Sequence, residues 1–180
     1  MTFDLKQEFE KRIPPGDDRN RNVCTHCGYV EYSNPKIVAG AVVHRDGKIL
    51  LCKRAIEPRK GYWTLPAGYM ENREDVETAA RREAQEEANA DIELEGVLGI
   101  YSVPRISQVQ VLFRAALLNE PSAGPESEAV GLFDWDEIPW EELAFPTVYW
   151  ALRQYHDTKA DKVLIPEFRT ALDSERPEGV

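Results

Sequence analysis

The segment Gly68–Ala90 reads GYMENREDVETAARREAQEEANA, and it decides the fold of this chain. It has no Gly or Pro after its first residue and is rich in Ala, Glu, Arg and Gln, which predicts a helix over its second half. Asn72 is the expected N-cap, because Glu74 and Asp75 would then lie at the positive end of the helix dipole.

Three carboxylates lie close together on this expected helix. With about 100° of turn per residue, Glu83, Glu86 and Glu87 fall within roughly one quadrant. Like charges at this spacing repel one another, so the cluster is either a solvated face or a site held together by a cation. Hard oxygen ligands suit Mg²⁺ or Mn²⁺, which would also bind a phosphate substrate.

The complete spacing resembles the Nudix box, G-x5-E-x7-R-E-U-x-E-E-x-G-U, in which U is apolar. The matching residues are Gly68, Glu74, Arg82, Glu83, Ala84, Glu86, Glu87 and Ala90. One position departs, because Asn89 stands where the family has glycine. Asn is the next best residue for the positive φ that ends a helix, so we expect the change to cost little stability.

Composition excludes several classes of protein. The chain has 180 residues, 42% of them hydrophobic and 30% charged, which suits one substantial domain with short extensions. A net charge of −10 argues against a nucleic-acid polymer as partner but allows a small nucleotide whose phosphates a metal ion neutralises. No apolar run approaches the roughly 18 residues of a membrane helix, and there is no apolar signal segment. Three cysteines without a sign of export predict a reducing cytoplasm.

The N-terminal region carries a single C-x2-C knuckle, formed by Cys24 and Cys27. The polar residues 1–22 before it predict a short helix and then a turn-rich loop. A structural zinc site commonly needs two such knuckles, and the third cysteine of the chain falls in a predicted core strand. Two hypotheses remain: a relic turn with two free thiols, or a zinc site completed by His26, His44 or a second subunit.

The remaining chain alternates apolar runs with turn signals. Lys36–Val43 and Lys48–Lys53 flank Asp-Gly, a dipeptide that favours a hairpin. The other expected elements are strands at Trp63–Leu65, Ile92–Val103, Gln108–Leu118 and Ala129–Trp135, and a helix at Phe145–Asp157. This order predicts an α/β fold in which helices sandwich a mixed sheet. The α/β/α fold of the Nudix family agrees with that interpretation.

We therefore predict three parts of the chain. Residues 1–35 form an N-terminal extension with the knuckle, residues 36–160 form the Nudix domain, and residues 161–180 form a tail. The tail is rich in Pro, Glu and Arg from Ile165 onward and is expected to be mobile.

Motifs beyond the box narrow the resemblance to one subgroup of the family. They are Cys24, Cys27, Gly28, Tyr32, Asn34, Pro35 and Lys36, then 50–54, 63–69, 106–109 and 124–127. Together they look like the subgroup that includes FAD and ADP-ribose pyrophosphatases, over roughly residues 23–157. The first C-x2-C of that subgroup's zinc ribbon is absent here, which argues against zinc.

The resemblance assigns roles to the box residues. It implies that Glu83, Glu86 and Glu87 bind Mg²⁺ or Mn²⁺, with the Gly68 carbonyl as a further ligand. It also implies an ion pair between Glu74 and Arg82 that holds the loop and the helix together.

The catalytic base and the substrate contacts are less closely defined. The base is Glu83 or Glu86 of the box, or a glutamate of a later loop, Glu126 or Glu128. Substrate contacts are expected from Arg54, Tyr101, Arg105 and Gln108.

The resemblance implies a Mg²⁺-dependent pyrophosphatase that converts FAD or ADP-ribose to AMP plus FMN or ribose 5-phosphate. Three alternatives stay open: hydrolysis of NADH or a nucleoside triphosphate, a nucleotide sensor without hydrolysis, and a zinc-ribbon interaction module. The S-Q-P-W-P-F-P segment of NADH pyrophosphatases is absent, and the three box glutamates favour an enzyme over a sensor. Relatives are often homodimers, so a homodimer is expected.

Overall fold

The structure, a computed structural model, describes residues 8–170. The chain divides into two compact units between Pro35 and Lys36. Each unit has a sheet of its own, and each is described by itself.

The first unit is a three-stranded antiparallel sheet. Its strands are β1 (Phe9–Arg12), β2 (Arg21–Cys24) and β3 (Val30–Glu31), in the order β1-β2-β3. Val23 and Cys24 are buried, and an Asn22–Glu31 side-chain hydrogen bond of 2.7 Å joins the neighbouring strands β2 and β3. The short helix predicted before the knuckle is therefore wrong for residues 8–22, and its remaining part lies outside the described residues.

The second unit contains one eight-stranded sheet and two α-helices in its described part. Its strands are β4 (Lys36–Arg45), β5 (Lys48–Arg54), β6 (Trp63–Thr64), β7 (Ala67–Tyr69), β8 (Ile92–Val103), β9 (Gln108–Leu117), β10 (Ser127–Phe133) and β11 (Glu167–Thr170). Its helices are α1 (Val76–Ala88) and α2 (Pro146–Thr158), with short 3-10 turns η1 (Pro104–Ile106), η2 (Trp135–Glu137) and η3 (Trp140–Glu142).

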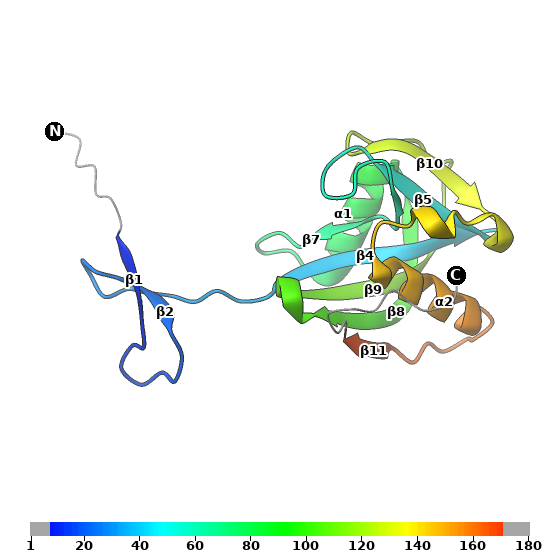
Figure 1. Cartoon of the computed structure of the whole chain (residues 1–180). Helices are drawn as coiled ribbons and strands as arrows, with labels where there is room; N and C mark the ends of the chain where they lie inside the picture. Colours follow the sequence, from blue (N-terminus) through cyan, green and yellow to red (C-terminus); the bar gives the residue numbers. More distant parts are fainter. Residues whose placement is uncertain (1–7, 171–180) are drawn as a thin grey trace. The chain divides into compact units, whose positions relative to one another are not determined.

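The sheet is mixed, and the two helices cover opposite faces of it (Figure 1). The strand order is β10-β5-β4-β9-β8-β11, with β6 paired to β5 and β7 paired to β4. The pairs β4–β9 and β8–β11 are parallel, whereas the other pairs are antiparallel. Alternate residues of β4 therefore point into two separate cores, one under each helix. The predicted α/β fold with a mixed sheet between helices is confirmed.

Local sequence signals placed the main elements correctly. Asp46 and Gly47 both have positive φ and close the β4–β5 hairpin. Asn89 ends α1 in the left-handed conformation with φ 46°, as expected for the residue in the place of glycine. The N-cap differs from the prediction: Asp75, not Asn72, accepts the Thr78 backbone N–H at 2.7 Å.

The tail contributes to the sheet. β11 pairs in parallel with the end of β8, so the expectation of a mobile segment is wrong for Glu167–Thr170. Residues 171–180 lie outside the described residues. Within residues 8–170, no helix is long and apolar enough to cross a membrane.

Candidate active site

A cavity of about 820 Å³ opens at the end of the sheet in the second unit. It is lined by α1, by the segments that follow β5 and β6, by the β8–β9 turn and by the start of α2. Four of the predicted carboxylates line it: Glu83, Glu86, Glu87 and Glu126. The cavity is large enough for a nucleoside diphosphate derivative.

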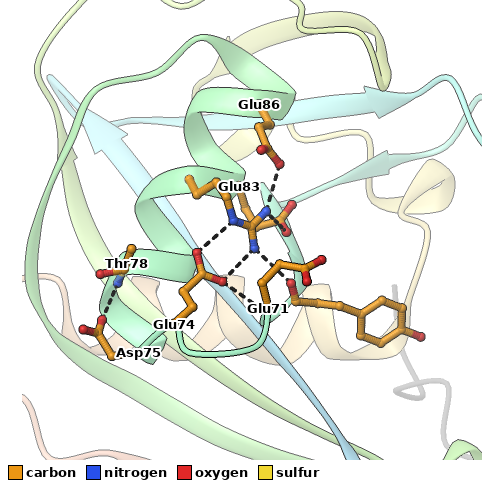
Figure 2. A network of polar contacts seen from close by, with 8 residues as sticks. Glu71, Glu74, Asp75, Thr78, Glu83 and Glu86 are labelled. Carbon is orange, nitrogen blue, oxygen red and sulfur yellow. Dashed lines mark hydrogen bonds and ion pairs between the residues drawn. The ribbon is translucent and has the colours of Figure 1, made fainter.

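Arg82 ties the start of the box to the helix (Figure 2). Its Nε and Nη2 donate to both carboxylate oxygens of Glu74, at 2.9 and 3.0 Å. Its Nη2 also donates to the Tyr69 carbonyl at 2.9 Å. These two parallel hydrogen bonds from the Arg82 guanidinium lower the pKa of Glu74. They form the Glu74–Arg82 ion pair that the resemblance implied.

The same guanidinium also reaches the metal-ligand candidates, which the sequence did not predict. Arg82 Nη1 lies 2.7 Å from Glu83 Oε1 and 2.8 Å from Glu86 Oε2. Figure 2 shows Glu74, Glu83 and Glu86 gathered around this one guanidinium. The cation that offsets the carboxylate repulsion in this structure is therefore an arginine side chain.

Glycine at position 68 lets the Glu83 carboxylate lie against the backbone. A Cβ built on Gly68 would lie 2.4 Å from that carboxylate, so any other residue would push the Glu83 side chain away from its present position. The backbone of β7 therefore runs directly beside the carboxylate. This close approach puts backbone oxygen within the same small region as the acidic side chains.

Burial divides the three box glutamates into two kinds. Glu83 and Glu87, four residues apart, are buried, whereas the Glu86 side chain is 53% exposed. Loss of hydration raises the pKa of Glu83 and raises the pKa of Glu87 to about 8. The Ala67 N–H, which donates to Glu87 at 3.2 Å, acts in the opposite direction and lowers the pKa of Glu87. The four-residue spacing between Glu83 and Glu87 turns both side chains toward the sheet, which is why both are buried.

Glu126 is carried by a loop that is fastened to the end of α1. Asn89 Nδ2 donates to the Ser122 and Ala123 carbonyls at 3.1 and 3.3 Å, and the Gly124 N–H donates to the Glu87 carbonyl at 3.0 Å. A Cβ on Gly124 would lie 1.8 Å from the Glu86 carbonyl, so only glycine allows this approach. The Asn89 side chain thus donates hydrogen bonds to the loop, which a glycine at this position could not do.

The donor set at this site fits a divalent ion. Its oxygens are hard ligands, its carboxylates repel one another, and Gly68 leaves the adjoining backbone without a side chain. Among the described residues, however, no three His, Cys, Asp or Glu side chains are arranged to hold an ion as they stand. An ion would have to compete with Arg82 for Glu83 and Glu86.

The predicted substrate contacts are only partly brought together. Arg54, Arg105 and Gln108 all line the cavity. Tyr101 does not: it is fully buried, its hydroxyl donates to Gln154 Oε1 at 2.5 Å, and its ring packs edge-on against Trp150. The prediction that Tyr101 contacts substrate is therefore wrong.

The structure adds cavity residues that sequence reasoning missed. They include Tyr69, Gln110 and Thr147. Tyr69 directly follows Gly68, and Gln110 is two residues from Gln108 on the same strand, so the alternation of β9 could have found Gln110. No local signal marks Thr147, which the start of α2 brings to the cavity from far along the chain.

The knuckle of the first unit does not fit a zinc ion by itself. The backbone N–H groups of Cys27 and His26 lower the pKa of the Cys24 thiol, as in a preformed ligand turn. Both cysteines are free, and the chain has no Cys or His before Cys24. Within the described part of the chain, no third ligand stands beside them.

Family comparisons match both units. A model described as NUDIX domain matches residues 34–157. A second, described as Nudix N-terminal and representing a zinc ribbon, matches residues 6–33.

Individual proteins extend these matches. An ADP-ribose pyrophosphatase from Methanocaldococcus jannaschii is 34% identical over 122 residues, which cover 65% of this chain and 71% of that protein. A NUDIX hydrolase structure from Nitrosomonas europaea is 40% identical and superposes with a TM-score of 0.85 over 95% of this chain and 99% of the other. An ADP-ribose pyrophosphatase structure from Streptococcus suis is 25% identical, with a TM-score of 0.63 over 75% of this chain and 99% of the other.

Proposed function

This chain belongs to the Nudix hydrolase family, and we propose that it is a divalent-metal-dependent pyrophosphatase that hydrolyses ADP-ribose or FAD. The products would be AMP plus ribose 5-phosphate or FMN. Two similar proteins, from M. jannaschii and S. suis, bear the name ADP-ribose pyrophosphatase, which supports the first substrate. The motifs outside the box support the second.

One observation carries the proposal: four glutamates from two distant segments line a single cavity. Glu83, Glu86 and Glu87 come from α1, and Glu126 comes from the loop before β10. Acidic side chains without a cation would repel a diphosphate, so this lining makes sense for a substrate that arrives with a metal ion.

Glu83, Glu86 and Glu87, with the Gly68 carbonyl, are the residues that would hold Mg²⁺ or Mn²⁺. When bound, such an ion offsets phosphate charge and makes a bound water more acidic. Arg82 holds the segment before α1 against the helix through Glu74, and so keeps the carboxylates and the Gly68 backbone together.

Glu126 is our candidate for the residue that accepts the proton of the attacking water. It lines the cavity from the loop beside the end of α1, and it lies close enough to raise the pKa of both Glu83 and Glu87. Glu83 and Glu86 remain the alternatives. A Glu126→Gln variant whose pH–rate profile loses its acidic limb would assign the base.

Positive side chains lie where a diphosphate derivative would extend from the carboxylates. Arg54 lies close enough to lower the pKa of Glu87, and its Nε donates to the Pro58 carbonyl at 2.8 Å, which fixes the guanidinium at the cavity wall. Arg105 lies on the η1 turn at the other side of the cavity. Each can meet phosphate or ribose oxygens.

Two further predictions belong to this function. A homodimer is expected from the resemblance, and sedimentation would measure it. The three free cysteines support a reducing compartment such as the cytoplasm.

The test is a hydrolysis panel with Mg²⁺ or Mn²⁺ and with EDTA controls. It offers ADP-ribose, FAD, NADH and nucleoside triphosphates, and chromatography resolves the products. AMP release from ADP-ribose or FAD that stops with EDTA is the expected result. Release from NADH or a triphosphate alone would change the substrate, and binding without any hydrolysis would make the chain a sensor.

A further inference from the structure

The cavity extends beyond the carboxylates over three strands of the sheet. Tyr69 on β7 lies opposite Val38 on β4, and Val38 lies beside Gln110 on β9. All three line the cavity. Because neighbouring strands are about 4.8 Å apart, this row forms a floor roughly 10 Å wide, with an aromatic ring on one side and a carboxamide on the other.

Tyr69 is held in place although it is 48% exposed. Its hydroxyl accepts a hydrogen bond of 2.8 Å from Gln108 Nε2, and the Lys36 ammonium lies 4.8 Å from the ring centroid. An aromatic side chain that is both exposed and fixed contributes little to a core. It is suited to stack against a flat ligand, because its orientation costs no further ordering.

Gln110 offers an unused hydrogen-bond acceptor beside that ring. Its Nε2 makes a long contact of 3.4 Å with Gln108 Oε1, and among the described residues no group donates to its Oε1. A carboxamide offers one donor and one acceptor side by side, which matches the edge of adenine. Ile106, which is 46% exposed, supplies an apolar rim to the same part of the cavity.

The cavity wall that carries Arg54 and Phe145 is less suited to a base. There the Phe145 ring already has the Arg54 guanidinium over it, 5.3 Å from its centroid. The Tyr69 ring likewise has the Lys36 ammonium over one face, but Phe145 is half-buried whereas Tyr69 is exposed, so Tyr69 leaves more of its ring open for stacking. Tyr69 and Gln110 reach the cavity from either side of β4, because β7 and β5 pair with one edge of β4 and β9 pairs with the other.

We propose that Tyr69, Gln110 and Ile106 form the subsite for the adenine ring of the substrate. The assignment rests on the proposed function, because the adenine ring reaches this subsite from a diphosphate that the glutamates and their metal ion hold. Tyr69 stacks on the ring, and Gln110 Oε1 accepts from the exocyclic amino group. ADP-ribose and FAD share this ring, so one subsite serves both.

The test separates binding from turnover. We would measure the Kd of AMP, the proposed product, by calorimetry with Mg²⁺ present. We would also measure kcat and KM for ADP-ribose, FAD and inosine diphosphate ribose, in which an oxo group replaces the adenine amino group. The variants are Tyr69→Leu, Tyr69→Phe and Gln110→Leu, and Tyr29→Leu, an exposed tyrosine of the first unit, is the matched control. Circular dichroism checks that each variant is folded.

Tyr69→Leu should weaken AMP binding about tenfold and raise KM for ADP-ribose and FAD alike, with kcat within about twofold of the wild type. Tyr69→Phe should keep most of the affinity, since stacking survives. Gln110→Leu should remove the preference for ADP-ribose over inosine diphosphate ribose. The Tyr29→Leu protein should match the wild type in every assay.

Three results would overturn the subsite: no AMP binding by the wild type, an unchanged AMP Kd in Tyr69→Leu, or a higher KM for FAD alone. The last would place the flavin, not adenine, against the ring. If the wild type binds AMP through Tyr69 but hydrolyses no substrate, the adenine subsite stands and the proposed function fails.

Discussion

The family matches imply a metal ion at two places in this chain: the carboxylate cluster of α1 and the Cys24–Cys27 knuckle. The two places differ in how many of the expected metal ligands are present. The cluster has three box glutamates, a loop glutamate and the Gly68 backbone around one cavity. The knuckle has two cysteines, and no third ligand stands beside them in residues 8–170.

The two sites differ in the role that a bound metal ion would have. A structural zinc ion contributes to folding by holding segments of the chain together, a task to which hydrogen bonds and ion pairs also contribute. In the first unit, Asp17–Arg21 and Asn22–Glu31 contacts of 2.9 and 2.7 Å are of this kind. No such contact can replace the ion that offsets phosphate charge during hydrolysis, so the chain must keep the carboxylates if it is an enzyme.

Glu87→Gln should break the cluster and produce the largest effect. We expect kcat to fall by more than about 100-fold, because the loss of an outer-shell partner alone costs roughly 10- to 100-fold. The protein should stay folded, since an amide oxygen can still accept the Ala67 N–H and glutamine fills nearly the same volume as the buried carboxyl group. Steady-state kinetics and thermal unfolding measure both.

The control for that variant is Glu77→Gln on the same helix. Glu77 is exposed and lies 3.7 Å from Arg81, so its loss should leave turnover unchanged. Near-normal activity of Glu87→Gln at saturating Mg²⁺ would show that the cluster is a charged surface and not a metal site.

Arg82→Lys should have a smaller effect, because it keeps the charge but loses the fork that grips Glu74 and the Tyr69 carbonyl. We expect about 10- to 100-fold lower kcat/KM and a loss of about 1–3 kcal/mol in the free energy of unfolding. Arg81→Lys, on the same helix and 47% exposed, is the matched control. Equal unfolding midpoints for both variants would mean that the fork does not hold the box together.

The sequence predicted the cluster because its signal is local. Helix spacing alone brings Glu83, Glu86 and Glu87 together, and Asp46-Gly47 marks its own hairpin. The N-cap was misplaced by three residues because Glu74 turns back to Arg82, so α1 starts only after Asp75. Glu74 and Arg82 are eight residues apart, and the prediction of an N-cap from the neighbouring residues does not consider a contact of that length.

The errors arose where long-range pairing decides the outcome. Tyr101 lies on β8 after two irregularities, at Leu94/Gly96 and Val97/Gly99, and each breaks the simple alternation of faces. β1 is short and charged, so it resembles a helix or loop until β2 pairs with it. Thr147 reaches the cavity only through the packing of α2 on the sheet.

Replacing both Cys24 and Cys27 by Ser should change turnover by no more than about twofold, since these residues lie in the other unit. A serine hydroxyl can accept the same backbone N–H groups that lower the pKa of the Cys24 thiol. Elemental analysis of the wild type should find no zinc. One equivalent of zinc, lost in the double variant together with folding, would show that ligands from elsewhere complete the knuckle.

The smallest effect is a titration within the first unit. Arg21 hydrogen-bonds Asp17 and lowers its pKa from 3.8 to about 2. A lowered folded-state pKa means that this contact stabilises the unit above pH 3.8 and is lost as the pH falls toward 2. NMR titration of the Asp17 carboxyl carbon should give a midpoint near 2, which Arg21→Gln should raise and Arg19→Gln should not, because only the Arg19 backbone N–H contacts Asp17. An Asp17 midpoint that Arg21→Gln leaves unchanged would show that this ion pair does not stabilise the unit, and would leave the pairing of β1, β2 and β3 and the Asn22–Glu31 contact as its described support.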